Sequence, residues 1–518
     1  MPTTIPAALL HAAERFGDRE ALIDGSARWT FADLADAALD SAAAMTAAGV
    51  ERGDRVAVWA PNGRLFVAAA LGAVTAGAVL VPLNTRFKGD EAAWILRRSG
   101  ARLLVTDNGF LGNDYAGMLR DAELPSLTEI ITLNGLGRLS WAEFLHRGSG
   151  VPRDETLARA DAVTADDVCD MFFTSGTTGR PKGVMTSHGQ NIRVYTAWAD
   201  GVGLRSGDRY LVINPMFHTF GYKAGLLACL IRGATIISQP VFDPAEALRL
   251  IAHERVTVLP GPPTLYASLL DHPARAGQDL SSLRLAVTGA AVVPVPLVMR
   301  MRAELFREVV IAYGLTESCG TVTVGDPHAD PETACRTVGR AIEGTEVIIG
   351  GPDGAPLPPG SSGEVLVRGY NVMRGYFEDP AATAAALDPA GWLHTGDVGT
   401  LDADGSLRIT DRLKDMFTVG GFNAYPAEIE QVIARHEQVS EAAVVGVPDA
   451  RLGEVGCAFV VPRPGAAPTE AEIIAFCRER LANFKVPRSV RTVAALPRNA
   501  SGKVLKTELR DRAARDES

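Results

Sequence analysis

The sequence predicts an α/β protein: a large N-terminal domain of mostly parallel sheets covered by helices, a small β-rich lobe, and a small, mobile α+β C-terminal domain. At 518 residues the chain is too long for a single hydrophobic core, so two or more domains are expected. Short β-branched runs such as DRVAVWAPN and LRLAVTGA alternate with Ala/Leu-rich helical patterns, which is typical of parallel sheets. From about Glu343 the pattern changes to short strands separated by turns, which indicates the β-rich lobe.

The domain boundary is placed after Asp411, giving residues 1–411 and 412–518. The second unit begins with a helical pattern, PAEIEQVIARH, followed by two strand patterns and two further helices. Within the large domain, the polar and irregular stretch from His146 to Asp166 is expected to link two sub-lobes.

Composition excludes several function classes. Apolar residues make up 47% and charged residues 22%, the balance of a soluble globular protein rather than a disordered or collagen-like chain. The net charge of -10 argues against a broad surface for nucleic acid or anionic lipid. An anionic ligand would therefore need local cationic groups.

The six cysteines are widely spaced and contain no CxxC pair, so they are expected to be reduced, buried thiols. The first residues lack a basic segment followed by an apolar run, so no secretory signal is expected. The uncharged stretch from Leu65 to Asn84 approaches the length of a membrane span. Its Ala/Gly composition, with Thr75 and Pro82, favours a buried helix leading into a strand. A cytoplasmic protein is expected.

The basic residues are strongly biased, with 44 arginines and only seven lysines. Where arginine is the default cation, each lysine is a candidate for a role that needs a compact charge on a flexible stem, although some of the seven will be incidental. The lysines are Lys88, Lys182, Lys223, Lys414, Lys485, Lys503 and Lys506.

The strongest local motif runs from Thr174 to Gly183, directly after the apolar strand pattern VCDMFF. Its glycines allow a tight turn, and its hydroxyl and backbone donors suit phosphate oxygens, with Lys182 as a mobile cation. It is not a Walker A loop, because Pro181 precedes the lysine and no Ser or Thr follows it. The alternative is a Ser/Thr/Gly-rich surface loop without a ligand.

The segment SGTTGRPKG resembles the phosphate loop of the acyl-adenylate-forming superfamily, which includes acyl-CoA synthetases, peptide-synthetase adenylation domains and luciferases. Five further motifs follow in the family's order: Tyr313–Glu317, Thr395–Asp397, Asp411–Asp415, Gly420–Asn423 and Pro497–Lys503. The acyl-CoA synthetase branch fits best. The resemblance implies that a carboxylate attacks the α-phosphate of ATP to give acyl-AMP and pyrophosphate. Coenzyme A then takes the acyl group, with Mg²⁺ as the metal.

The resemblance also assigns residues to ATP. Glu317 and Thr177 would hold magnesium, Tyr313 would stack on the adenine, Asp397 would accept from the ribose hydroxyls, and Arg412 would reach the ribose or a phosphate. The alternative for each is structural, such as a surface aspartate or an arginine in a salt bridge. The full set is Thr174, Ser175, Gly176, Thr177, Thr178, Gly179, Lys182, Gly289, Ala290, Ala291, Tyr313, Gly314, Thr316, Asp397 and Arg412.

Lys503 is the implied catalytic residue of the C-terminal domain. The matching family lysine contacts the carboxylate and the α-phosphate, where it would stabilise the charge of the transition state. The small domain would therefore close for adenylation and rotate for thioester formation, with Lys414 at the hinge. Gly420, Gly421 and Phe422 would line the tunnel for coenzyme A, and a side chain at position 421 would block it.

The acyl pocket is expected around Pro215–Tyr222, with His218, Phe220, Tyr222 and Lys223 as its residues. Amino-acid-activating relatives usually carry an aspartate where His218 stands, so an α-amino acid is disfavoured. His218 resembles a gate that orients the carboxylate; a core histidine is the alternative. Lys223 either donates to an oxygen at the far end of the substrate or pairs with a core carboxylate or solvent.

The segments HTFGYKAG, VLPGPPTLY and LAVTGAAVVP also resemble actinobacterial FadD-type ligases, including those for the indanedione propanoate left by steroid ring degradation. This implies a keto-bearing alicyclic or steroid-derived propanoate. Four alternatives stay open: a medium- or long-chain fatty acyl-CoA synthetase, an acyl-AMP ligase that loads a carrier protein, a non-catalytic nucleotide-binding module, and a luciferase-like oxidase. The oligomeric state is also open, with a homodimer among the options.

Overall fold

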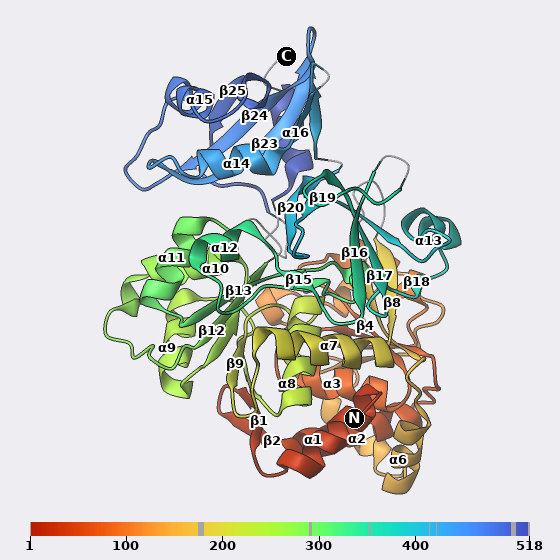
Figure 1. The fold of residues 1–518 in the computed structure, drawn as a ribbon. Coiled ribbons are helices and arrows are strands. Elements are labelled where there is room, and N and C mark those ends of the chain that lie inside the picture. The colour runs from red at the N-terminus through yellow and green to blue at the C-terminus, as the bar shows by residue number, and fades with distance from the viewer. Residues whose placement is uncertain are drawn as a thin grey trace.

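The computed structural model describes residues 2–174, 181–289, 293–351, 354–413, 415–420, 422–498 and 504–515. Within these ranges the strands form two large sheets and two small ones, with helices between and outside the large pair (Figure 1). This confirms the predicted α/β class, with a large N-terminal part and a smaller C-terminal unit.

The first large sheet has nine strands in the order β15-β14-β13-β12-β11-β9-β10-β1-β2. Its centre, from β13 to β1, is parallel, and antiparallel strands flank it on both edges. The strands are β1 (Glu20–Asp24), β2 (Ala27–Thr30), β9 (Arg209–Val212), β10 (Thr235–Ser238), β11 (Val258–Pro260), β12 (Leu285–Gly289), β13 (Glu308–Tyr313), β14 (Thr323–Val324) and β15 (Arg340–Ala341).

The second large sheet has seven strands in the order β18-β8-β7-β4-β3-β5-β6. Strands β7, β4, β3, β5 and β6 are parallel, whereas β8 and β18 add an antiparallel edge. The bounds are β3 (Arg55–Trp59), β4 (Val79–Pro82), β5 (Leu103–Thr106), β6 (Glu129–Thr132), β7 (Val168–Thr174), β8 (Lys182–Ser187) and β18 (Gly375–Tyr376).

Alternating side chains of the strands divide the core into layers. Val56 and Val58 belong to the core shared by both sheets, whereas Ala57 and Trp59 face the opposite side of β3. The shared core also holds helices α1 (Ile5–Phe16), α2 (Phe31–Ala47), α3 (Arg64–Thr75), α7 (His188–Val202) and α8 (Ala228–Arg232). Helices α9 (Pro244–Glu254), α10 (Pro263–Asp271) and α11 (Val295–Glu304) cover the outer face of the nine-stranded sheet (Figure 1). Helix α4 (Gly89–Ser99) covers the outer face of the seven-stranded sheet. The result is five layers.

The uncharged stretch from Leu65 to Asn84 folds as expected, into the buried helix α3 and the buried strand β4. Among the described residues, no helix has the length and hydropathy needed to cross a membrane. None of the six cysteines, all among the described residues, forms a disulfide: five are buried and Cys335 is partly buried.

The sequence suggested an irregular stretch from His146 to Asp166, and the structure shows that this prediction is wrong. After α5 (Trp141–Gly148) it forms helix α6 (Arg153–Ala162), in which only Thr156 and Ala160 are buried. A helix that buries two small side chains has no apolar stripe, so its sequence lacks the usual helical periodicity.

Two small sheets complete the fold. Strands β16 (Thr345–Gly350), β17 (Ser362–Gly369), β19 (Leu393–Leu401) and β20 (Leu407–Arg412) form the antiparallel β-rich lobe, next to which helix α13 (Pro380–Ala386) lies. Helix α12 (Pro331–Arg336) packs instead against α11 and β13 of the nine-stranded sheet. The C-terminal sheet contains β21 (Phe417–Val419), β22 (Phe422–Ala424), β23 (Val439–Asp449), β24 (Gly453–Pro462) and β25 (Ser489–Thr492), with α14 (Pro426–Ile433), α15 (Glu470–Arg478) and α16 (Lys506–Arg515).

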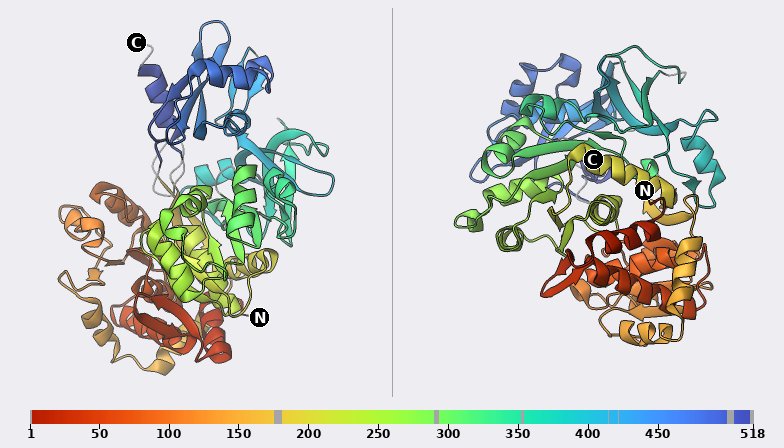
Figure 2. Two further views of the ribbon diagram at one scale, coloured as in Figure 1. Left: turned by 90° about the vertical axis from the view of Figure 1, so that its left-hand side faces the viewer. Right: turned by 60° about the horizontal axis from the view of Figure 1, so that its bottom comes forward.

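The C-terminal unit has its own hydrophobic core, whose first residue is Phe417. It follows β20 and lies at the opposite end of the molecule from the N-terminus (Figures 1 and 2). The boundary after Asp411 stays a prediction, since β20 itself runs through Arg412.

Close packing of α5 on α2 gives a test of the inter-sheet core. A Cβ added at Gly148 would lie 2.5 Å from the backbone nitrogen of Ala44, whereas at Gly150 nothing lies within 4 Å. Gly148→Ala should therefore lower the free energy of unfolding by about 1–3 kcal/mol, because backbone must move. Gly150→Ala is the matched control and should be close to neutral in urea unfolding. Equal effects of the two substitutions would show that this contact does not limit the packing.

Candidate active site

Three of the predicted segments lie at one edge of the nine-stranded sheet. In the nine-stranded sheet, the acyl segment follows β9, Gly289 ends β12 and Tyr313 ends β13. These strands are parallel, so their carboxyl ends lie on the same side. Such an edge is where open α/β sheets bind ligands.

Both ends of the phosphate loop are held by a hairpin. Thr174, the last residue of β7, pairs across the ladder with Lys182, the first residue of β8. The five loop residues assigned to ATP between them (Ser175, Gly176, Thr177, Thr178 and Gly179) lie outside the described residues.

Tyr376 joins the phosphate loop to Glu317, a connection that the sequence did not suggest. The Lys182 Nζ lies 4.9 Å from the centroid of the Tyr376 ring, and the Tyr376 hydroxyl donates to Glu317 Oε1 at 2.9 Å. Burial and the neighbouring carboxylate raise the pKa of this phenol, so it stays a donor. The only signal in the sequence was an aromatic residue in a Gly-Tyr pair.

Glu317 sits in a compact turn, η5 (Thr316–Ser318), that follows β13. The turn closes through Cys319 and Gly320, which have φ angles of 55° and 93°. A Cβ at Gly314 would lie 2.3 Å from the carbonyl oxygen of Gly320, so the motif needs a glycine there. A carboxylate fixed beside a phosphate loop suits Mg²⁺, which typically takes one or two carboxylates together with substrate phosphates.

Tyr313, Asp397 and Arg412 form one hydrogen-bonded cluster. The Tyr313 hydroxyl donates to Asp397 Oδ2 at 2.6 Å, and Arg412 Nε lies 3.0 Å from Oδ1. Asp397 and Arg412 are cross-strand partners in β19 and β20. The Asp397 carboxylate is 5% exposed and, with about four acceptor positions, can accept further hydrogen bonds from a ligand.

Gly289 lies beside this cluster at the end of β12. A Cβ there would come within 2.3 Å of the carbonyl oxygen of Ala312, the residue before Tyr313. Only glycine therefore permits the close approach of β12 and β13 at this point. Ala290 and Ala291 lie outside the described residues.

The acyl segment enters an unusual helix. After β9 the chain forms the π-helix η3 (Phe220–Leu227), a form often found at functional sites. A Cβ at Gly221 would lie 2.2 Å from the carbonyl oxygen of Pro215, so glycine allows this helix to pack closely against the preceding acyl segment. Phe220 is partly buried, whereas Tyr222 is fully buried and packs against Phe172 with ring centroids 6.0 Å apart.

His218 is accessible to solvent, yet desolvation by the surrounding protein lowers the pKa of its imidazole. Its Nδ1 accepts from the backbone N–H of Phe220 at 3.3 Å, so the neutral ring carries its proton on Nε2.

Lys223 pairs with a buried carboxylate, which is one of the two interpretations that the sequence left open. Its Nζ lies 3.0 Å from Asp170 Oδ1 and 2.7 Å from Thr186 Oγ1, and both side chains of the ion pair are 0% exposed. Burial alone would lower the pKa of Lys223, but the Asp170 carboxylate holds it above its ordinary value. The reason for assigning Lys223 to the substrate was a lysine without a partner, and that reason no longer holds.

The residues predicted as catalytic (Lys503), as the hinge (Lys414) and as part of the tunnel (Gly421) lie outside the described residues. Gly420 directly follows β21 and has a φ of 56°, and Phe422 begins β22. The two lysines without an assigned role in this unit are structural: Lys485 pairs with Glu428 and Lys506 with Glu430.

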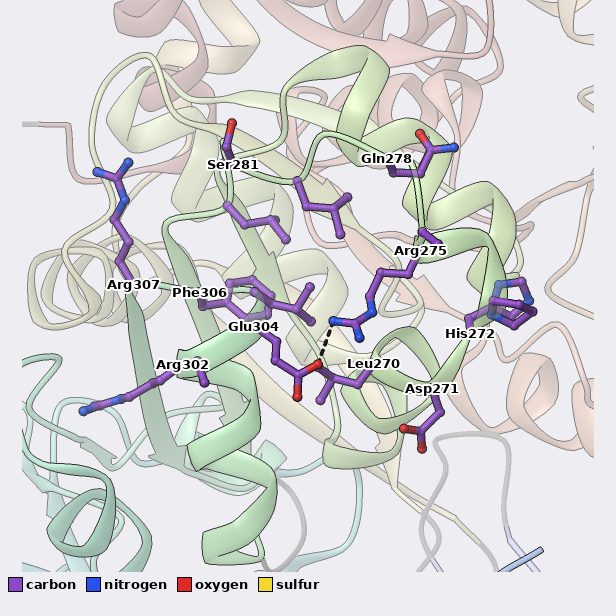
Figure 3. A pocket seen from close by; sticks show the side chains of 16 residues that line it. Leu270, Asp271, His272, Arg275, Gln278, Ser281, Arg302, Glu304, Phe306 and Arg307 are labelled. Carbon is purple, nitrogen blue, oxygen red and sulfur yellow. Dashed lines mark ion pairs between the residues drawn. The ribbon is translucent and has the colours of Figure 1, made fainter.

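A cavity of about 760 Å³ opens elsewhere, between α10, α11 and the short helix η4 (Pro273–Arg275) (Figure 3). Arg275 and Glu304 form an ion pair across it at 2.7 Å. None of the predicted site residues lines this cavity, so it is separate from the candidate active site.

Comparison with known proteins identifies the family of this chain. Residues 9–377 match the AMP-binding enzyme family, and residues 428–503 match the AMP-binding enzyme C-terminal domain. The chain belongs to the AMP-binding enzyme family, in its acyl-CoA ligase branch.

Two relatives share more than half of their residues with this chain. Both are named as CoA ligases of the 7a-methyl-1,5-dioxo-octahydroindenyl propanoyl group. The one from Mycobacterium tuberculosis is 54% identical, with 98% of each chain covered. The one from Rhodococcus jostii is 52% identical, covering 98% of this chain and 99% of the relative. Among solved structures, ATP-bound MatB from Rhodopseudomonas palustris is 31% identical with a TM-score of 0.89, covering 99% of both chains.

The buried ion pair predicts a large effect on stability. Lys223→Met leaves the Asp170 carboxylate buried without its cation, which should lower the free energy of unfolding by about 3–5 kcal/mol. Arg153→Met is the control, because its pair with Asp36 has side-chain exposures of 58% and 59%. An exposed pair contributes about 1 kcal/mol or less. Similar shifts of the two variants in urea unfolding would contradict a desolvated charge pair in the core.

Proposed function

We propose that this chain is an ATP-dependent CoA ligase for a bicyclic, keto-bearing propanoate, the indanedione propanoate of its relatives, and that it acts through an acyl-adenylate. The observation that carries the substrate is the 54% and 52% identity, over nearly the whole chain, to two ligases named for that acyl group. The reaction type is supported by family membership and by the grouping of the motif residues at one sheet edge.

In this proposal the phosphate loop and Lys182 bind the triphosphate, and Tyr376 keeps Glu317 beside them. Magnesium, held by Glu317 and Thr177, would offset phosphate charge while a second anion approaches. Thr316 and Thr174 complete the phosphate contacts. Asp397 and Arg412 would hold the ribose, with the Tyr313 ring fixed against the adenine by its hydrogen bond to Asp397.

His218 would orient the acyl carboxylate. Its lowered pKa keeps the imidazole neutral at physiological pH, and the backbone bond to Nδ1 leaves Nε2–H free to donate. A neutral donor can align a carboxylate without quenching its nucleophilicity as a strong ion pair would. Lys503 then stabilises the charge that develops on the α-phosphate as the carboxylate attacks.

The C-terminal unit, residues 412–518, would act twice. Closed, it delivers Lys503; rotated about Lys414, it opens the tunnel lined by Gly420, Gly421 and Phe422 to coenzyme A. A reaction that uses ATP and coenzyme A is expected in the cytoplasm.

The chemistry of the acyl segment supports an uncharged tail. Residues Pro215–Tyr222 include no acidic or basic side chain other than His218, and the charge of Lys223 is neutralised internally by Asp170. Such a wall has no counter-ion for an ammonium group. Fatty acids satisfy this condition too, so the bicyclic acid rests on the relatives.

A panel of acids tests the substrate. With ATP, Mg²⁺ and free CoA, the bicyclic keto-propanoate should exceed palmitate and octanoate in kcat/KM by at least about tenfold, equivalent to about 1.4 kcal/mol. The products should be its CoA thioester, AMP and pyrophosphate. Mass spectrometry detects the thioester, and a pyrophosphate-release assay measures the rate. A preference for unfunctionalised chains would contradict the substrate, and transfer only to a carrier protein would contradict the CoA ligase.

Lys503 and Gly421 should separate the two half-reactions. Lys503→Ala should lose about 3–4 kcal/mol of transition-state stabilisation in acyl-AMP formation, which slows that half-reaction. The variant should still convert synthetic acyl-AMP to the CoA ester. Gly421→Leu should do the reverse, because a side chain would fill the tunnel. The exposed Lys88 gives a control, Lys88→Ala, expected to behave as the wild type. Parallel losses of both half-reactions in either variant would refute the assigned role.

A further inference from the structure

The buried Lys223–Asp170 pair is the centre of a larger polar cluster, which we define as Lys223, Asp170, Thr186, Asn191 and Cys319. The Thr186 hydroxyl donates to Asp170 Oδ1 at 2.6 Å and accepts from Lys223. Asn191 Nδ2 lies 3.0 Å from Asp170 Oδ2, and Lys223 Nζ lies 3.6 Å from Cys319 Sγ. All five side chains are buried.

The members of this cluster come from the supports of the candidate site. Asp170 is on β7, four residues before Thr174, and Thr186 is on β8, four residues after Lys182, so they flank the phosphate loop. Cys319 follows directly on the turn that carries Glu317. Lys223 belongs to η3, the π-helix that follows His218.

One ammonium group therefore contacts three supports: the hairpin of the phosphate loop, the Glu317 turn and the acyl segment. Helix η3 lies close against the acyl segment, because a Cβ at Gly221 would come within 2.2 Å of the carbonyl oxygen of Pro215 and 2.4 Å of that of Asn214. The Cys319 end is also fixed, since its carbonyl oxygen accepts from the Tyr195 hydroxyl at 2.9 Å.

Stability alone is a weak reason for such a pair. A buried ion pair can often be replaced by apolar side chains of similar volume without loss, because desolvation offsets the attraction between the charges. Directional contacts, in contrast, fix a unique arrangement of the elements that they join.

We propose that Lys223 is a positioning residue: through Asp170, Thr186 and Cys319 it sets the phosphate loop and Glu317 in register with the acyl segment. The proposal rests on the function proposed above, for which these three elements bind ATP and the acid. Lys223 touches neither ligand and acts only through the supports.

The consequence differs between the half-reactions. Adenylation needs the phosphate loop, Glu317 and the acyl segment at once, whereas transfer from preformed acyl-AMP no longer needs the pyrophosphate contacts. Loosening the cluster should slow adenylation far more than transfer. A purely structural loss would lower both equally, through the fraction of folded enzyme.

Thr186→Val tests this without leaving an unpaired charge, because it removes the hydroxyl shared by Lys223 and Asp170 at nearly constant volume. We expect kcat/KM for ATP in adenylation to fall by about tenfold or more, with transfer from synthetic acyl-AMP within about threefold of wild type. Thr186→Ser, which restores the hydroxyl, should recover most of the adenylation rate. Thr196→Val is the matched control, since that hydroxyl donates only to Ile192 within α7.

A second variant keeps the test independent of folding. Lys223→Met with Asp170→Asn removes both charges together, so its thermal midpoint should exceed that of Lys223→Met alone, while adenylation stays slow. Recovery of both the midpoint and the adenylation rate would overturn the positioning role and leave a structural pair.

The rates are measured with whichever acid the wild type adenylates best, and the affinity for ATP alone is measured by calorimetry. A wild type that rejects the bicyclic acid but uses another would refute the proposed substrate only. Unchanged adenylation and ATP affinity in Thr186→Val would refute the positioning role only.

Discussion

The fully buried ion pair between Lys223 and Asp170 is the constraint on which the candidate site depends. It brings together a strand of the seven-stranded sheet and a π-helix that follows a strand of the nine-stranded sheet. The phosphate loop is held by one sheet and Tyr313 by the other, so a site that uses both needs the two sheets in fixed register. Close packing of the inter-sheet core holds the two sheets together, and the directional hydrogen bonds of the polar cluster within it fix how the sheets are aligned.

A second set of contacts adds the edge strand β18 and the β-rich lobe to this arrangement. Tyr376 on β18, in the seven-stranded sheet, ties Glu317 to the phosphate loop, and Asp397 on β19, in the β-rich lobe, accepts a hydrogen bond from Tyr313 at the end of β13. Arg412 binds the other oxygen of Asp397 and is the last residue of β20, where the proposed C-terminal unit begins. Binding of a nucleotide at Asp397 would thus act on a residue two positions before the proposed hinge.

Much of this could be predicted from the sequence, because phosphate binding leaves local patterns of glycine, hydroxyl and lysine residues, and because parallel strands leave apolar runs. The long-range partners could not. Asp170 is hidden in the apolar run VCDMFF, and Tyr376 lies in a segment with no motif of its own. Helix α6 was missed because it buries only two small side chains. The argument from Lys223 to a ketone-bearing acid rested on a premise that the structure removes, whereas the resemblance to steroid-derived propanoate ligases agrees with the relatives.

The central claim is that one buried charge pair holds three supports of the site as a single unit. Native-state hydrogen exchange of the wild type and of the variant with Lys223→Met and Asp170→Asn measures this directly. Amides of β7, β8 and the Glu317 turn should lose protection together with those of η3, because the supports then open independently of global unfolding. Loss of protection confined to η3, with β7, β8 and the Glu317 turn as protected as in the wild type, would contradict the claim.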